Sequence, residues 1–255
     1  MKQPQDKFYT DPEIAQHCIN TIDEQFDLWL EPSAGSGSFL HHLPDNRLGL
    51  DIIPDAPDVR CQDFLLWTPA VDCSICTIGN PPFGKNSSMA ISFFNHAALF
   101  SDMIAFIVPR TWSRISFQNR LPLDWHCVYE ETLPDQIFKM QGKVGQIDFA
   151  YPCVWQIWTP TTVRRRKYRA ATAHPDWSWT TRDKANWVLR RTGGLAGTLS
   201  QDFSCADEGN YFIFCTDETA HRLKTLYADL QAVAKQSAYP NLPKSEVVRI
   251  YTNSN

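Results

Sequence analysis

The sequence predicts an α/β protein with a doubly wound, mostly parallel sheet and a small α+β appendage on its C-terminal side. Across residues 1–159, short apolar runs alternate with helix-like stretches, a pattern typical of parallel strands joined by helical crossovers. A glycine-rich turn and an Asn-Pro-Pro-Phe segment each follow one of these runs, where sheets of this kind bind ligands. The composition changes after Thr159, so we expect one domain over 1–159 and a smaller basic element over 160–255.

Five apolar runs of the first domain predict strands, at Leu28–Leu30, Arg47–Leu50, Ser74–Ile78, Met103–Val108 and Cys127–Glu131. Apolar spacing predicts helices at Pro12–Ile22, Ser36–His42 and Ser88–Phe100. The segment Ile147–Trp158 is expected to form a hairpin or a bulged edge strand, broken at Tyr151–Pro152. In the second element we expect a strand over Tyr211–Cys215, a helix over Thr219–Lys235, and a loose tail over Pro240–Asn255 docked through Val247, Val248 and Ile250.

Composition excludes several classes of protein. Of 255 residues, 43% are hydrophobic and 20% charged, which is ordinary for a globular chain. No apolar run approaches the ~18 residues that a membrane span needs, and the first residues lack the apolar segment of a secretory signal. We therefore expect a cytoplasmic or nucleoid-associated protein, nuclear in a eukaryote, with no membrane partner. Eight cysteines are too sparse for a disulfide scaffold. Cys73 and Cys76 lack a second pair at zinc spacing, so no metal is expected.

Charge is distributed unevenly along the chain. The net charge is −4, but residues 161–195 carry +7 and the remaining residues −11. This basic stretch also contains Trp177, Trp179 and Trp187. Clustered cations with flat side chains are typical of nucleic-acid contacts, which do not depend on overall net charge. A solvated basic strand with tryptophans in a small core remains the alternative.

The turn Glu31-Pro-Ser-Ala-Gly35-Ser-Gly37 follows the apolar run at Leu28–Leu30. Glycines let backbone approach a ligand closely and adopt positive φ. Twenty residues beyond Glu31, Asp51 ends a predicted strand, where a carboxylate suits a ribose diol. Asp63 and Phe64 follow, an acid and a ring that could bind and cover an adenine. Each segment alone also fits an ordinary turn or cap.

The segment Asn80-Pro-Pro-Phe83 is the strongest signal, because it follows the predicted strand Ser74–Ile78. Two consecutive prolines restrict φ and remove two backbone donors. They hold the Asn80 side chain and the Pro81 carbonyl rigidly, so that two oxygen acceptors face one point. Such a pair suits an incoming –NH2 group, and Phe83 supplies a flat face for a planar base. The alternative is a rigid loop with no ligand.

Taken in order, these segments resemble class I S-adenosylmethionine-dependent methyltransferases with a Rossmann-like fold, specifically N6-adenine methyltransferases. The order is similar to the gamma type of bacterial DNA adenine methyltransferases, and the resemblance covers residue 7 to about residue 158. It starts at Phe8-Tyr-Thr10-Asp-Pro12, although Asp11 stands where many relatives have proline. It implies that S-adenosylmethionine is the cofactor and that the cofactor is bound by Tyr9, Thr10, Glu31, Pro32, Ser33, Ala34, Gly35, Gly37, Asp51, Ile52, Asp63, Phe64 and Asn80.

The resemblance also implies catalysis by Asn80, Pro81, Pro82 and Phe83 on a flipped adenine in DNA. Loops after the strands should surround that base. We expect substrate contacts from Lys85, from the basic-aromatic pattern Arg110, Trp112 and Arg114, and from Arg164, Arg165 and Arg166. The recognition element is short, so a partner subunit or a homodimer could complete it. Restriction-modification is one of several roles that the sequence leaves open.

Three rival interpretations remain open. The nucleic acid could be RNA, since some ribosomal, spliceosomal and cap-adenosine methyltransferases also carry Asn-Pro-Pro-Phe. The acceptor could be a protein glutamine amide, although that family usually has tyrosine where this chain has Phe83. The chain could also be a non-catalytic partner subunit that retained the fold. DNA is preferred over RNA because of the segment order and the Phe-Tyr-Thr start.

Overall fold

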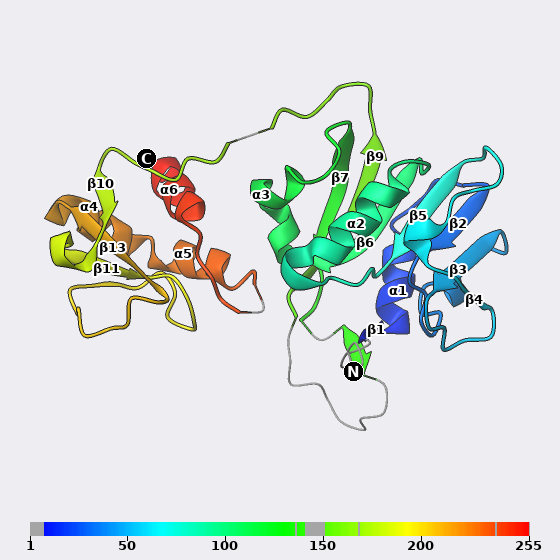
Figure 1. Ribbon diagram of the computed structural model, residues 1–255, viewed down its shortest axis with the longest axis horizontal. Helices are drawn as coiled ribbons and strands as arrows, with labels where there is room; N and C mark the ends of the chain where they lie inside the picture. Colours follow the sequence, from blue (N-terminus) through cyan, green and yellow to red (C-terminus); the bar gives the residue numbers. More distant parts are fainter. Residues whose placement is uncertain (1–7, 136, 141–150, 168, 238, 255) are drawn as a thin grey trace. The chain divides into compact units, whose positions relative to one another are not determined.

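The computed structural model describes residues 8–135, 137–140, 151–167, 169–237 and 239–254. The chain forms two compact units, Met1–Lys167 and Tyr168–Asn255 (Figure 1). The sequence places the boundary earlier, after Thr159. The difference arises because Arg165 belongs to the first unit, where its guanidinium donates to the carbonyls of Trp125, Gln118 and Pro122. No helix of the described residues is long and apolar enough to cross a membrane.

The first unit is built on a seven-stranded sheet in the order β4-β3-β2-β5-β6-β9-β7. Its strands are β2 (Leu28–Glu31), β3 (Arg47–Asp51), β4 (Val59–Cys61), β5 (Ile75–Gly79), β6 (Met103–Pro109), β7 (Trp125–Thr132) and β9 (Cys153–Pro160). The five strands from β4 to β6 are parallel, and β9 runs antiparallel to both of its neighbours. This confirms the predicted doubly wound, mostly parallel sheet. The strand order reverses between β2 and β5, which are neighbours in the sheet.

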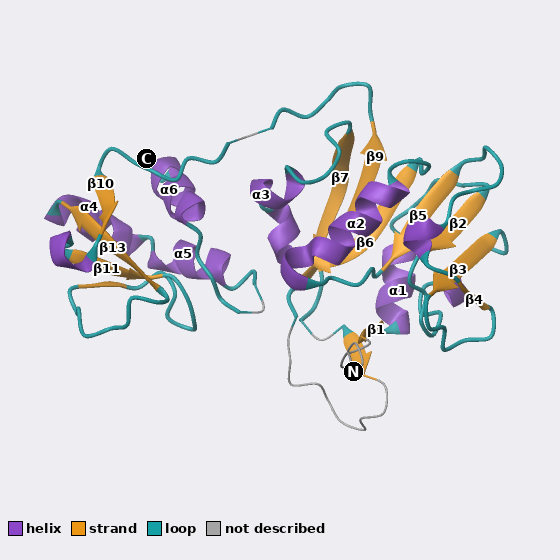
Figure 2. Cartoon of the chain, in the orientation of Figure 1, coloured by secondary structure: helices purple, strands orange, loops and turns teal. Residues whose placement is uncertain are grey.

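Helices pack on both faces of this sheet (Figure 2). Helix α1 (Pro12–Ile19) covers one face of the sheet and packs in one core with strand residues of that face, which include Trp29 and Ile78. Helix α2 (Ser88–Ala97) shares a core with the opposite face, including Leu30. Because both faces are covered, every residue of β5 and β6 is buried, which is why these strands are continuous apolar runs in the sequence. A short helix, α3 (Ile115–Gln118), follows β6.

The predicted helix Ser36–His42 is absent. The segment is a series of turns with one 3-10 turn at Leu40–His42. Gly35 has φ +51° and Gly37 has φ +83°, values outside the right-handed helical region, which glycine adopts at low cost. Helices α1 and α2 also end earlier than predicted. Of the predicted segment Ile147–Trp158, residues 147–150 lie outside the described residues, and the strand β9 begins at Cys153.

A two-stranded ribbon joins distant parts of the first unit and was not predicted. Strand β1 (Phe8–Thr10) pairs antiparallel with β8 (Phe138–Met140), and Thr10 lies opposite Phe138. Just beyond the ribbon, the backbone N–H of Asp11 donates to the Ile137 carbonyl at 2.9 Å. The Asp11 side chain then caps α1 by accepting from the Glu13 N–H, as Asp does at helix N-termini.

The second unit has a four-stranded antiparallel sheet in the order β10-β13-β11-β12. Its elements are β10 (Trp177–Thr180), β11 (Trp187–Arg190), β12 (Leu199–Ser200), β13 (Asn210–Cys215), α4 (Asp217–Thr225), α5 (Tyr227–Ala234) and α6 (Lys244–Asn253). The helix predicted over Thr219–Lys235 is divided at Leu226 into α4 and α5. The expected loose tail is instead the helix α6. Its buried residues include Val247, Val248 and Ile250, as predicted. Trp177 and Trp187 lie in the core of this unit.

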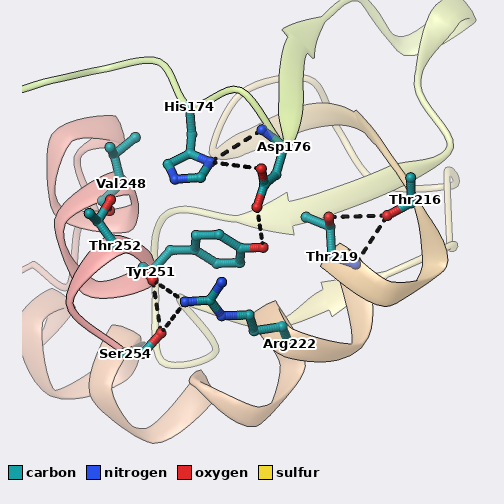
Figure 3. A network of polar contacts seen from close by, with 9 residues as sticks. All are labelled: His174, Asp176, Thr216, Thr219, Arg222, Val248, Tyr251, Thr252 and Ser254. Atoms are coloured by element: carbon teal, nitrogen blue, oxygen red, sulfur yellow. Dashed lines mark hydrogen bonds and ion pairs between the residues drawn. The ribbon is translucent and has the colours of Figure 1, made fainter.

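A polar network around Tyr251 fastens α6 to the rest of the second unit (Figure 3). The Tyr251 hydroxyl donates to Asp176 Oδ2 at 2.7 Å, just before β10. Its ring lies 4.8 Å from the His174 ring and 3.9 Å from the Arg222 guanidinium of α4. Arg222 also donates to the Tyr251 carbonyl at 2.7 Å and to the Ser254 hydroxyl at 3.0 Å. The Tyr251 side chain of α6 therefore contacts both α4 and the segment just before β10.

Tyr251→Phe keeps the ring and removes the hydroxyl that donates to Asp176 and contacts Thr219. We expect the second unit to lose about 1 kcal/mol of unfolding free energy, the usual net value of such a bond, with the Asp176 carboxylate half exposed to water. Urea unfolding of the whole chain measures the loss. The control Thr252→Ala removes a hydroxyl on the exposed side of the same helix and should change stability by less than ~0.5 kcal/mol. Equal stability of Tyr251→Phe and the native chain would contradict the role of the network.

Candidate functional site

The candidate site lies at the carboxyl ends of β2 and β5, where the strand order reverses. In doubly wound sheets this is the place where ligands bind. The turn after β2 and the loop after β5 are in direct contact, because the Ser33 hydroxyl donates to the Asn80 carbonyl at 3.0 Å. The sheet thus brings together two segments that the sequence singled out separately. Among the described residues, no group of three or more His, Cys, Asp or Glu could hold a metal ion.

Glu31 organises the turn after β2. The residue is 2% exposed, and its carboxyl group accepts the backbone N–H of Leu40 at 2.8 Å and that of Phe39. Burial holds the pKa of Glu31 well above its usual range, more than these two bonds lower it. Gly79, at the end of β5, has φ +143°, and a Cβ there would lie 3.1 Å from Glu31 Cγ. The carboxyl side chain therefore needs glycine at the end of the neighbouring strand.

Asp51, at the end of β3, faces the same turn. Its Oδ2 accepts the Gly35 N–H at 2.9 Å, and its Oδ1 accepts the Ile53 N–H at 2.8 Å. Each carboxylate oxygen has a second lone pair, so the group can still accept from a diol. The next residue, Ile52, is 56% exposed. An acceptor and an exposed apolar residue thus follow each other at the end of β3.

The ribbon of β1 and β8 brings Tyr9 and Thr10 to this turn. The Tyr9 hydroxyl donates to Asp55 Oδ2 at 2.6 Å, and the Asp55 N–H donates to the Gly35 carbonyl at 2.9 Å. Partial burial, with Asp55 adding to it, raises the pKa of Tyr9. A Cβ on Gly35 would lie 3.1 Å from the Tyr9 ring. The Thr10 hydroxyl is buried and has no hydrogen-bond partner among the described residues.

The segment Asp63-Phe64 has the structural role that the sequence left open as the alternative, a cap beside a core ring. Asp63 caps the 3-10 turn Phe64–Leu66 by accepting the Leu65 N–H at 2.9 Å. The Phe64 ring is 1% exposed and packs 5.1 Å from the Phe93 ring. The prediction that this ring covers a ligand is therefore corrected, because both ring faces lie in the core. Pro32 and Ala34 are buried within the turn after β2.

The loop after β5 carries the observation with the clearest chemical meaning. Asn80 Oδ1 is buried and has no hydrogen-bond partner among the described residues. Pro81 is buried and Pro82 exposed. The Phe83 carbonyl accepts the N–H groups of Met89 and Ala90, which ties the loop to the start of α2. A buried oxygen without a donor costs about 1–3 kcal/mol, so it indicates a donor that arrives with a ligand.

Sequence reasoning missed two aromatic residues beside this loop. The Phe83 ring, half-buried, lies 5.2 Å from the Tyr151 ring and 6.3 Å from the Phe138 ring. We call Phe83, Phe138 and Tyr151 the aromatic cluster. Phe138 comes from β8, and Tyr151 was interpreted only as a strand break. No local pattern marks either residue, because both reach Phe83 through pairing over long sequence distances.

The backbone of the residues directly after this loop is strained. Asn86 and Ser87 have φ values of +52° and +56°, which are uncommon for residues other than glycine. Arg120 donates to the Asn86 carbonyl at 2.8 Å and so supports this backbone. Such conformations cost on the order of 1–3 kcal/mol each and cluster at functional sites.

The residues predicted to contact substrate divide into two groups. Lys85, Arg164 and Arg166 are exposed and can meet a substrate. The other predicted contact residues are buried or make contacts within the first unit. Trp112 is 1% exposed and packs on Phe94, and Arg114 is also buried. The prediction that Trp112 contacts the base is corrected, because the turn after β6 folds it into the core.

Arg110 and Arg165 also serve the fold. Arg110 donates to the Leu133 carbonyl at 2.9 Å and pairs with Asp135 at 3.0 Å. Arg165 donates to three backbone carbonyls, and its guanidinium lies 5.4 Å from the Trp158 ring. A phosphate could bind either guanidinium only by competing with these contacts.

Glu31→Gln should stabilise the first unit in a pH-dependent way. The raised pKa means that the folded chain keeps a proton that the unfolded chain releases above the ordinary value of 4.5. The favourable contribution of this group is complete below that pH and is lost as the pH rises through the folded-state pKa. The neutral amide avoids this loss and keeps an oxygen for the Leu40 N–H. The stability difference, variant minus native, should therefore grow as the pH rises above 4.5.

Thermal unfolding across that pH range measures the effect. Glu24→Gln removes an exposed carboxylate and controls for the change in net charge. A difference that stays constant with pH above 4.5 would show that Glu31 is already ionised in the folded protein.

No family model and no curated protein matches this sequence. Solved structures that resemble the chain include the modification subunit of what is described as a type I restriction enzyme from Vibrio vulnificus, 16% identical over 63% of this chain and 46% of that chain, with a TM-score of 0.46. A protein described as an RNA methyltransferase from Pyrococcus horikoshii is 15% identical over 63% and 92%, TM-score 0.45. The M protein of the type I restriction enzyme EcoKI is 17% identical over 65% and 47%, TM-score 0.43. The chain thus spans less than half of either modification subunit, and its chemistry is inferred from its own residues.

Proposed function

We propose that this chain is a methyltransferase that uses S-adenosylmethionine to methylate the N6 amino group of adenine in nucleic acid, with DNA preferred over RNA. One observation carries the proposal. The buried Asn80 Oδ1 lacks a donor among the residues that the structure describes, stands where the strand order reverses, and is followed by the ring of Phe83. An exocyclic amino group on a planar base supplies the missing donor and a face that stacks on the ring.

The chemistry follows from the amino group itself. Its nitrogen is a poor nucleophile because its lone pair is delocalised into the base. Asn80 Oδ1 and the Pro81 carbonyl would accept its two N–H groups and favour a tetrahedral nitrogen. Positioning and prearranged acceptors of this kind contribute several orders of magnitude in rate. No side chain with a shifted pKa is needed as a base, and none is assigned.

The turn after β2 fits the cofactor. Gly35 leaves a space that a Cβ would fill against Tyr9, and the Thr10 hydroxyl has an unused hydrogen-bonding capacity. We assign the methionine portion to the turn between Glu31 and Gly37, the ribose to Asp51, and the adenine ring to the exposed Ile52 with Asp63 nearby. The bound cofactor supplies a methyl group already activated by its sulfonium.

The target base has to leave its stack to reach Asn80, at a cost of a few kcal/mol. The aromatic cluster is placed to offset this cost, because stacking on an aromatic side chain contributes about 1–3 kcal/mol per base. Lys85, Arg164 and Arg166 are the exposed cations that we assign to phosphates. The preference for DNA rests on the order of the segments along the chain and on the Phe-Tyr-Thr start.

Asn80→Ala should lower the rate of methyl transfer by about 10²–10³-fold, the usual effect of removing one prearranged polar group. Cofactor binding should persist. Because Asn80 Oδ1 has no partner within the described chain, the substitution breaks no bond of that oxygen, and the variant should unfold at the native temperature or above it. Asn20→Ala, on the exposed end of α1, is the matched control. An Asn80→Ala variant with native activity would refute the catalytic assignment.

The substrate is tested with tritiated methyl from S-adenosylmethionine, offered with unmethylated double-stranded DNA, single-stranded DNA and total RNA in parallel. We expect label in DNA, recovered as N6-methyldeoxyadenosine. Label confined to RNA would keep the chemistry and reassign the substrate. Cofactor binding without label in any nucleic acid would contradict the proposed function and favour a protein acceptor or a missing subunit.

A further inference from the structure

Two cations and two aromatic rings meet in the second unit, which we call the cation–aromatic cluster: Trp179, Arg191, Tyr211 and Lys244. They come from β10, the end of β11, β13 and the start of α6 (Figure 1). Lys244 Nζ lies 5.0 Å from the Trp179 ring centre and 5.3 Å from that of Tyr211. The Arg191 guanidinium lies 5.2 Å from the Tyr211 ring, and the two rings are 5.2 Å apart. All four side chains are half-buried.

Neither cation has a counter-charge among the residues that the structure describes. Other half-buried arginines have either a carboxylate, as in the pairs Arg182–Asp207 and Arg110–Asp135, or backbone carbonyl acceptors, as Arg165 and Arg222 do. In contrast, Arg191 Nε is buried without a hydrogen-bond acceptor in the described chain. The cluster therefore holds two positive charges in a partly apolar setting with only ring faces as compensation.

This arrangement is electrostatically incomplete. Removing a cation from water is costly unless it is paired, and a ring face returns only about 0.5–2 kcal/mol. An anion with several oxygen acceptors would complete the site, because charge-assisted hydrogen bonds to phosphate are among the strong ones. The rings also restrict the two side chains, so less conformational entropy is lost when an anion binds.

We propose that Arg191 and Lys244, which both lie against the Tyr211 ring, each contact a phosphate in the backbone of the nucleic-acid substrate, an inference that rests on the proposed function. Further cations near the cluster favour a nucleic acid over a free anion as the ligand. Arg190 and Lys184 are exposed on the same unit, and the part of the basic stretch that belongs to this unit, residues 168–195, carries +3. A repeating phosphodiester can contact several such cations, whereas one small anion cannot.

The salt dependence of binding tests this site. A labelled duplex that contains adenine is titrated with the full chain by fluorescence anisotropy at several chloride concentrations. Each phosphate contact contributes about 0.9 to the slope of log affinity against log salt. The variant with both Arg191→Gln and Lys244→Met removes the charges and keeps much of the packing on the rings. We expect its slope to be smaller than the native slope by roughly 2.

Two controls separate charge from folding. Arg191→Lys with Lys244→Arg keeps both charges and should restore most of the native slope. Lys235→Met removes an exposed cation of the same unit, outside the cluster, and should leave the slope unchanged. Thermal unfolding of each variant shows whether the second unit is intact.

The outcomes for the site and for the proposed function differ. Equal slopes for the native chain and the charge-removing variant, with methyl transfer intact, would reject the phosphate site alone. A native chain that transfers no methyl group but shows the expected slope difference would reject the proposed function alone. Inorganic phosphate could instead stabilise the native chain and not the variant, while the duplex slopes of the two are equal. That result would reassign the site to a free anion and overturn the inference.

Discussion

The burial of the Glu31 carboxyl group is the constraint on which the site depends. By accepting the backbone N–H groups of Phe39 and Leu40, this group replaces the helix that the sequence predicts with a compact turn. Its side chain also lies against Gly79, at the strand end that leads directly into Asn80. One buried side chain therefore determines both the shape of the cofactor turn and the approach of the catalytic loop. The Ser33–Asn80 hydrogen bond completes the link.

Two buried polar groups of the site lack partners within the described chain. Asn80 Oδ1 and the Thr10 hydroxyl are buried without partners among the described residues, and Asn86 and Ser87 are strained. Folding alone would favour their removal, since each costs free energy that nothing in the described chain returns. Local departures from good packing are expected where a ligand, rather than the fold, supplies the missing contact.

Basic residues show that composition alone does not identify a binding surface. Arg110, Arg165 and Arg182 hold backbone carbonyls or a carboxylate in place, although the sequence presents them as the same cationic type as Arg164 or Arg191. What distinguishes them is the set of acceptors that the fold places around each guanidinium. The proposed nucleic-acid contacts are therefore limited to cations that the fold leaves exposed or without a counter-charge.

The sequence by itself indicated five of the seven strands of the sheet, though not β4, and the position of Asn80 at the end of β5, because buried parallel strands are continuous apolar runs and their ends are marked by glycine and proline. It also indicated the buried residues of α6, Val247 and Val248, though not that they belong to a helix. Only the tertiary structure decided which side chains stand beside Asn80. Phe138 and Tyr151 reach Phe83 through the β1–β8 pairing and the start of β9, while Phe64 and Trp112 turn into the core. Local residue patterns encode periodicity and turns, but the face that a loop residue presents depends on packing against segments far away in the chain.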